Sequence, residues 1–391
     1  FAQIRGQVFA FHLPRDNLLR LHLLNWNAPA TQGISTSQLR PATISFTLPR
    51  IMRIAIVGLG YMGRMHYQNW RKIAGAEVVA IQDVAIEKVK ESMAAKGNIP
   101  GAADSIDFNS VATFTDFDRM LAQARPDAVS ITVPTYLHDD LTCRALQAGL
   151  HVLCEKPMAL TVGQCDRMIE AARKHKRLLQ VAHCIRFWPQ YVWAREAVMK
   201  GTYGKLLAAG FRRLGSLPKW NPDNWFADEK LSGGVALDLH IHDSDFVHYL
   251  LGLPDAVLSA IDPTRRHVQT QYLYGKNGIP VNGEGSWAMG PSFGFEMSFN
   301  IALESASIQY DSSRKPSFRV CPHDDKAFTP EIVSGDGYSR EIEHFAAAVA
   351  GKTVPSVITP EQSRDTIRLV LAEIESAKRA NIVNLTGPNA H

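Results

Sequence analysis

The 391-residue sequence is poor in cysteine, and its five cysteines, at positions 143, 154, 165, 184 and 321, form no C-x-x-C pair. This odd, scattered set argues against a disulfide framework and against a zinc ribbon, and it predicts a reducing, cytoplasmic compartment. Long apolar runs are missing as well. Because no stretch of about 18 apolar residues occurs, the sequence predicts no membrane-spanning helix.

The sequence also lacks an excess of one charge, since 42 basic residues face 38 acidic ones. A net charge of +4 gives no reason to expect a nucleic acid or an anionic membrane as a partner. Residues 1–51 are the exception, because Asp16 is their only acid beside five arginines. Two interpretations stay open: an Arg-rich targeting segment, or an extension upstream of a start at Met52, which we favour. Under both, residues 1–51 stand outside the fold.

A glycine-rich turn lies between a predicted strand and a predicted helix. Residues Arg53–Val57 form a short apolar run, Gly58-Leu-Gly60-Tyr-Met-Gly63 follows, and a helical pattern covers 64–73. Gly58 permits a tight turn, Gly60 lets the backbone approach a pyrophosphate, and Gly63 lets the helix pack against the strand. Asp83 ends the next strand about 20 residues later, where a carboxylate accepts from ribose hydroxyls and repels a 2′-phosphate. The pattern predicts NAD binding, with NADP less suited.

Strands and helices continue to alternate up to residue 183. Apolar runs at 127–133, 151–154 and 178–182 are separated by helical patterns at 137–148 and, after the N-cap Thr161, up to about 175. Such alternation predicts a doubly wound parallel sheet, with ligands at the carboxyl ends of its strands. We therefore predict an NAD-binding Rossmann domain at 52–183 and a substrate-binding α/β domain at 184–385. In the second, strands are expected at 206–211, 257–261, 297–303 and 306–310, a turn at 275–278, and helices at 338–350 and 360–380.

Two further motifs suggest a family. Glu155-Lys156-Pro157 follows a late parallel strand, and Gly233-Gly234 precedes Asp238-x-x-x-His242. With the glycine turn, in this order and spacing, the sequence resembles the glucose–fructose oxidoreductase/inositol dehydrogenase/MocA (Gfo/Idh/MocA) family, and especially its inositol 2-dehydrogenase-like members. The resemblance implies a second domain with a large, mostly antiparallel sheet, a catalytic set of Lys156, Asp238 and His242, and homodimers or homotetramers joined through open sheet faces.

The chemistry of these residues suits oxidation of a secondary alcohol. His242 is assigned as the general base, and the Lys156 ammonium would stabilise the developing alkoxide. Asp238 is expected one helical turn before His242, on the same face. Glu155 would contact ribose or orient Lys156, which Pro157 restricts to an extended conformation. We expect cofactor contacts at Gly58, Gly60, Tyr61, Met62, Gly63, Asp83, Pro134, Thr135, His138, Glu155 and Lys156, and substrate contacts at Lys156, His183, Arg186, Trp225, Asp238 and His242.

Simpler interpretations stand beside these. The Trp220–Trp225 loop suits a sugar ring, but its tryptophans suit core packing equally well. His240 and His242 form a His-x-His pair that could bind zinc on a strand. We expect 235–251 to be helical, where the two side chains point apart, and predict no metal. The function predicted is hydride transfer between NAD and a sugar, inositol or related polyol. The alternatives are an NAD-dependent glycosidase, a sugar oxidoreductase with tightly held cofactor, and a non-catalytic dinucleotide-binding sensor or regulator.

Overall fold

The structure, a computed structural model, describes residues 51–91, 106–218, 225–275 and 278–385, and two short strands near the N-terminus. The chain divides into two compact units, 1–51 and 52–391. In the first, β1 (Ala2–Ile4) pairs antiparallel with β2 (Gln7–Phe9). The other residues of this segment, up to residue 50, lie outside the described ranges, so both interpretations of residues 1–51 stay predictions. None of the helices within the described ranges is long and apolar enough to cross a bilayer.

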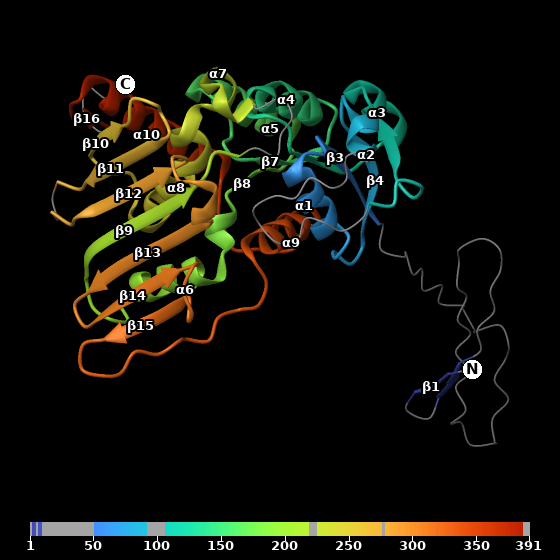
Figure 1. Cartoon of the computed structure of the whole chain (residues 1–391). Coiled ribbons are helices and arrows are strands. Elements are labelled where there is room, and N and C mark those ends of the chain that lie inside the picture. The colour runs from blue at the N-terminus through green and yellow to red at the C-terminus, as the bar shows by residue number, and fades with distance from the viewer. Residues whose placement is uncertain are drawn as a thin grey trace, which may run out of the picture. The chain divides into compact units, whose positions relative to one another are not determined.

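Six parallel strands form the first sheet of the second unit, in the order β5-β4-β3-β6-β7-β8 (Figure 1). The strands are β3 (Met52–Val57), β4 (Ala76–Gln82), β5 (Ala112–Phe114), β6 (Ala128–Ile131), β7 (His151–Glu155) and β8 (Leu179–Ala182). The helices between them are α1 (Tyr61–Trp70), α2 (Ile86–Glu91), α3 (Phe117–Ala124), α4 (His138–Gln147), preceded by the 3-10 turn η2 (Thr135–Leu137), and α5 (Val162–His175).

Both faces of this sheet are covered, because alternate residues of a strand point to opposite sides. Ile54 and Ile56 of β3 pack in a cluster with Trp70 of α1. The same cluster takes in Phe345 of α9 (Gly337–Val349), so a helix from far along the chain completes this face. Val57 lies on the opposite face, in a cluster that includes residues of α3, α4 and α5. The arrangement places the carboxyl ends of β3, β6 and β7 at one edge.

Eight strands form the second sheet, in the order β15-β14-β13-β9-β12-β11-β10-β16. Every neighbouring pair is antiparallel except β9 and β12. The strands are β9 (Leu206–Gly215), β10 (Ala256–Ile261), β11 (His267–Leu273), β12 (Val281–Ser286), β13 (Phe295–Leu303), β14 (Ala306–Asp311), β15 (Phe318–Pro322) and β16 (Val383–Asn384). The predicted fold class, a parallel Rossmann sheet with a second, mostly antiparallel sheet, is confirmed.

Three helices cover one face of the second sheet: α6 (Pro189–Met199), α8 (Ile241–Leu251) and α10 (Pro360–Arg379) (Figure 1). The chain passes from the first sheet to the second through β8, the 3-10 turn η3 (Cys184–Phe187) and α6. Before α8, the short helix η4 (Trp225–Ala227), α7 (Glu229–Ser232) and one π-helical turn, η5 (Ala236–His240), follow each other. The predicted turn at 275–278 lies partly outside the described residues.

Candidate active site

The glycine turn has the geometry that a dinucleotide requires. Gly58 has φ +89°, and a Cβ there would lie 2.9 Å from the Thr132 backbone. A Cβ on Gly63 would lie 2.0 Å from the Gly58 carbonyl oxygen, so the helix can approach the strand only without a side chain. A Cβ on Gly60 would meet nothing within 4 Å, which leaves open space above the turn. Helix α1 begins at Tyr61, three residues before the predicted start at Arg64, so Tyr61, Met62 and Gly63 form its first turn.

This helix start also fits the charge of a pyrophosphate. The first turn of α1 contains no acidic residue, and free N–H groups at a helix N-terminus favour an anion. Asp83 stands beside it: one carboxylate oxygen accepts from the Leu59 N–H at 2.7 Å and the other from the Ala85 N–H at 2.8 Å. Each oxygen keeps lone-pair capacity for a ribose hydroxyl. The residues present therefore fit a dinucleotide.

Lys156 meets a residue from the second half of the chain. Its ammonium donates to the Asp238 backbone oxygen at 2.7 Å and to Asp238 Oδ1 at 3.2 Å. An ammonium has three N–H donors, so one remains for a substrate oxygen. The two side chains are 14% and 11% exposed, which leaves them shielded yet reachable. The Lys156–Pro157 peptide bond is cis, which the sequence did not indicate.

Two histidines share the neighbourhood of this ammonium. Burial, and then the positive charges of Lys156 and Arg213, hold the pKa of His242 well below its ordinary value. Burial lowers the pKa of His183 to about 4, although Asp245 lies 3.4 Å from its Nδ1 and acts in the opposite direction. Both imidazoles are therefore neutral at neutral pH. A neutral imidazole can accept a proton from a hydroxyl, as a general base must.

Glu155 turns inward rather than toward open space. The residue is 6% exposed, and its Oε1 accepts from His66 Nε2 at 2.9 Å while its Oε2 accepts from the Lys156 backbone N–H at 3.1 Å. Of the two predicted roles, these contacts support orientation of Lys156. Burial opposes ionisation of Glu155, but the His66 contact and the Lys156 charge outweigh it and lower the pKa of the carboxyl.

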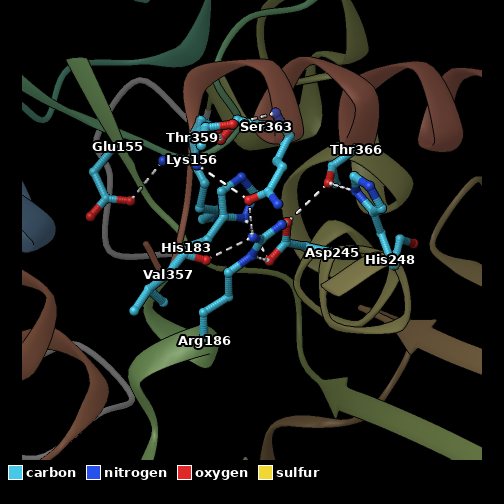
Figure 2. Close-up of polar contacts among 12 residues, drawn as sticks. Glu155, Lys156, His183, Arg186, Asp245, His248, Val357, Thr359, Ser363 and Thr366 are labelled. Carbon is cyan, nitrogen blue, oxygen red and sulfur yellow. Dashed lines mark hydrogen bonds and ion pairs between the residues drawn. The ribbon is translucent and has the colours of Figure 1, made fainter. Parts of the chain in front are cut away.

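Arg186, predicted as a substrate contact, has internal hydrogen-bond partners in the structure. Its guanidinium is buried and donates to both oxygens of Asp245 at 2.8 Å, and to Val357 O and Gln362 Oε1 (Figure 2). The Asp245 carboxylate also accepts from Thr366. Because every nitrogen of the guanidinium has an internal acceptor, Arg186 joins η3, α8 and α10, and its substrate contact stays a prediction.

Other predicted contacts also have internal partners. His138 is 1% exposed, and its two ring nitrogens lie 2.8 and 2.9 Å from the Pro157 and Val133 carbonyl oxygens. Burial lowers the pKa of His138. Thr135 is buried in η2, directly after Pro134. Trp225 stacks on Phe226 with ring centroids 4.1 Å apart. The rest of the predicted aromatic loop, residues 220–224, lies outside the described residues.

The predicted helix at 235–251 is interrupted. Asp238 lies in the π-helical turn and His242 in α8, so the spacing of an uninterrupted α-helix, from which we placed them on one face, does not apply. His240 is fully buried, with Nε2 3.2 Å from the Tyr272 hydroxyl and 3.4 Å from Glu373. These partners belong to β11 and α10, so His240 connects the segment to both elements.

Family comparisons agree with this geometry. One family model, the Gfo/Idh/MocA oxidoreductases with an NAD-binding Rossmann fold, matches residues 52–183, and the C-terminal domain model of the same family matches residues 191–309. The chain belongs to the Gfo/Idh/MocA family. The predictions of the family and of its NAD-binding Rossmann fold are thereby confirmed. The roles of the individual site residues remain predictions.

The chain is similar to dehydrogenases of an inositol and of a glucoside. Myo-inositol 2-dehydrogenase of Thermotoga maritima is 31% identical over 201 residues, 51% of this chain and 55% of the relative. The chain thus spans about half the length of that relative. D-glucoside 3-dehydrogenase of Escherichia coli is 28% identical over 85% of this chain and 97% of its own length. The solved structure of a levoglucosan dehydrogenase with NADH and levoglucosan has a TM-score of 0.72 at 20% identity, over 86% of this chain and all of that one.

Sequence analysis missed three residues of this Gfo/Idh/MocA site. His66 lies on α1, Arg64 is 8% exposed within electrostatic reach of Asp83, and Glu341 lies on α9 beside Glu155. His66 and Arg64 follow Gly63 directly, so their place in the first turns of α1 was a usable signal. Glu341 is far from the other residues along the chain, and only the packing of α9 on the first sheet brings it there.

Proposed function

We propose that this chain transfers hydride between NAD and a secondary alcohol of a sugar, inositol or related polyol. The observation that carries the proposal is the contact between the Lys156 ammonium and Asp238, at 2.7 and 3.2 Å, beside the glycine turn that fits the cofactor. A dinucleotide sensor or regulator has no need of a lysine and a carboxylate held together beside a neutral histidine. The relatives named as inositol, glucoside and levoglucosan dehydrogenases support the substrate class.

The residues divide the chemistry between them. Asp238 holds the Lys156 ammonium with two acceptors, so that its remaining N–H points to the substrate hydroxyl and stabilises the alkoxide that forms. His242, kept neutral by burial and by Lys156, accepts the hydroxyl proton. NAD, when bound, supplies the hydride acceptor. The positive charge of Lys156, and then that of Arg213, disfavours the imidazolium that this transfer forms.

Trp225 is proposed as part of the wall that holds the sugar. It stacks on Phe226 and precedes α7, which contacts η2 at the carboxyl end of β6. An aromatic face at this edge suits the C–H face of a pyranose or cyclitol ring. His183, whose two ring nitrogens have no hydrogen-bond partner among the described residues, is proposed to contact a ring hydroxyl.

Two further proposals concern the state of the protein. A homodimer or homotetramer is proposed through the open face of the second sheet, where Leu207 and Leu258 are 49% and 38% exposed. Light scattering at several concentrations measures this directly. A cytoplasmic location is proposed because all five cysteines are free thiols, which a reducing compartment preserves.

The activity is tested by following NADH formation from inositols, pyranosides and anhydrosugars, with NADP in parallel. Lys156→Met should lower turnover by roughly 10²- to 10⁴-fold while NAD still binds. Lys200→Met is the control, since Lys200 is 69% exposed and its ion pair is with Glu196 on the same helix, α6. Turnover of Lys156→Met near the wild-type rate would contradict the assignment. Glycoside cleavage without net NADH would instead favour an NAD-dependent glycosidase.

A further inference from the structure

Behind Lys156 lies a buried cluster of two carboxyl groups and one imidazole. One atom each from His66, Glu155 and Glu341 lie within 4.8 Å of one another, and the three residues are 0%, 6% and 0% exposed. They come from α1, β7 and α9, so the packing of α9 on the first sheet creates the cluster. His66 Nδ1 is buried without a hydrogen-bond partner among the described residues.

The carboxyl groups of Glu155 and Glu341 differ in their hydrogen bonds. Glu155 has two donors, His66 Nε2–H at 2.9 Å and the Lys156 N–H at 3.1 Å. Neither oxygen of Glu341 has a hydrogen-bond partner among the described residues. Two carboxylates this close cannot both ionise away from water, and the one with donors keeps the charge. Burial and the nearby Glu155 charge raise the pKa of Glu341 well above its ordinary value.

Most of the titratable neighbours of these two carboxyl groups, among the described residues, are neutral at neutral pH. The titratable groups that face the two carboxyls are His138 of α4, His183 and Cys184 after β8, Asp336 and Tyr338 at the start of α9, and Lys156 itself. Burial lowers the pKa values of His138 and His183 and raises those of Cys184 and Tyr338, so these four are neutral at neutral pH. Lys156 and Asp336 remain as the charged neighbours.

We propose that His66 and Glu341 are positioning residues that confine a single negative charge to Glu155, directly behind the Lys156 ammonium. His66 holds this charge through its Nε2–H, and Glu341 keeps its proton so that no second charge forms. Glu155 in turn fixes the Lys156 backbone and favours the charged ammonium. The inference rests on the proposed function for its kinetic test, which needs a substrate that is turned over. Its spectroscopic test needs only the protonated carboxyl of Glu341.

The spectroscopic test needs no substrate. The infrared difference spectrum of wild type minus Glu341→Gln at neutral pH should contain the C=O stretch of one protonated buried carboxyl. The same difference for Glu343→Gln, an exposed acid two positions away on α9, should lack it. If the Glu341 spectrum shows only an ionised carboxylate, the proposal is overturned, whether or not any sugar is turned over.

The kinetic test compares pH profiles of kcat/KM on the best sugar or polyol. Glu155→Gln removes the charge, and the high-pH limb of the profile should move toward lower pH, because the cationic site loses a nearby negative charge. His66→Ala should move it the same way, because Glu155 loses a donor, and His66→Gln should restore it, because an amide N–H can replace Nε2–H. Glu341→Gln should leave the midpoint in place. Glu343→Gln is the control for basal activity.

Two results would overturn the proposal in this arm. One is a Glu341→Gln midpoint that moves as far as that of Glu155→Gln, because Glu341 would then carry charge. The other is a stoichiometric divalent metal in the purified protein that chelator removes together with the activity, since a cation would then occupy the place of the retained proton. Circular dichroism of each variant separates loss of fold from loss of positioning.

Discussion

Replacing Arg186 with alanine would leave a buried carboxylate without its partner. Arg186 and Asp245 are both fully buried side chains, joined by two hydrogen bonds of 2.8 Å (Figure 2). Burial alone would raise the pKa of Asp245, but Arg186 and then His183 lower it to about 2. The carboxylate thus depends on the guanidinium for its charge. Without it, Asp245 must either take up a proton or remain charged away from water.

The loss of stability expected for Arg186→Ala follows from this burial. Breaking a buried pair by removing one partner costs about 3–5 kcal/mol, whereas an exposed pair contributes about 0–1 kcal/mol. Arg173 and Glu361 provide the matched exposed pair, at 2.7 Å with side chains 71% and 36% exposed. Arg186→Ala should therefore lower the free energy of unfolding by about 3–5 kcal/mol and Tm by roughly 6–10 °C. Arg173→Ala should change Tm by less than about 2 °C.

Thermal and urea unfolding of both variants, beside Michaelis constants for the best sugar, decide between two roles. Arg186→Ala that unfolds at the wild-type temperature but binds sugar weakly would refute the structural argument. It would restore the substrate contact that the sequence predicted. An equal loss of stability in Arg173→Ala would refute the contrast between buried and exposed pairs.

Three further outcomes are expected. Gly63→Ala should abolish NAD binding by calorimetry, because its Cβ would lie 2.0 Å from the Gly58 carbonyl oxygen; unchanged affinity would contradict the packing argument. Asp83→Ala should raise the ratio of NADP to NAD use about 10-fold or more, as two hydrogen bonds to the ribose and the repulsion of a 2′-phosphate disappear; an unchanged ratio would remove Asp83 from cofactor choice. Burial raises the pKa of Glu373 to about 8 in the folded protein, whereas in the unfolded chain this carboxyl loses its proton at about pH 4.3. The free energy of unfolding of the wild type should therefore fall as the pH rises from about 4 to about 8. The Glu373→Gln variant should lack this loss of stability. If the difference in Tm between the variant and the wild type stays constant over this pH range, Glu373 does not have the raised pKa.

Local sequence signals were sufficient for the regular elements of the first sheet. The apolar run at 53–57 is β3, and its alternate residues reach separate clusters on the two faces. Thr161 accepts from the Gln164 N–H as the N-cap of α5, as expected. Thr359 and Pro360 begin α10, with Thr359 accepting from the Gln362 N–H. Caps, glycine turns and apolar periodicity act within a few residues, which is why sequence alone reveals them.

The second sheet shows where local signals fail. Strand β12 has the sequence VNGEGS, in which Val281 is the one β-branched residue and no aromatic residue occurs. Its glycines allow close packing against His240. A Cβ on Gly283 would lie 2.8 Å from His240 Cε1, and a Cβ on Gly285 would lie 2.9 Å from His240 Cβ. Strand β11 does alternate buried and exposed residues over His267–Leu273, and that signal was available but not used.

Within the site, the sequence identified residues but not always their partners. The Lys156–Asp238 contact was expected from the family resemblance, and the structure brings the two residues together. Arg186 follows the last strand of the first sheet, which suggested a place in the crevice. Its partner Asp245 lies 59 residues further on, in a helix whose orientation no local pattern reveals. The same limit hid Glu341.

The acid- and histidine-rich segment 238–248 illustrates why composition alone does not identify a metal site. Successive helical residues are about 100° apart, so neighbours along this segment face different elements. Each of four residues has its own partner: Asp238 with Lys156 after β7, His240 with Tyr272 on β11, Asp243 with Arg213 on β9, and Asp245 with Arg186 on η3. Among the described residues, the group of three close enough to share a cation lies elsewhere, at His66, Glu155 and Glu341. The segment therefore connects to four different elements, and its carboxylates at 238, 243 and 245 each pair with a different basic residue.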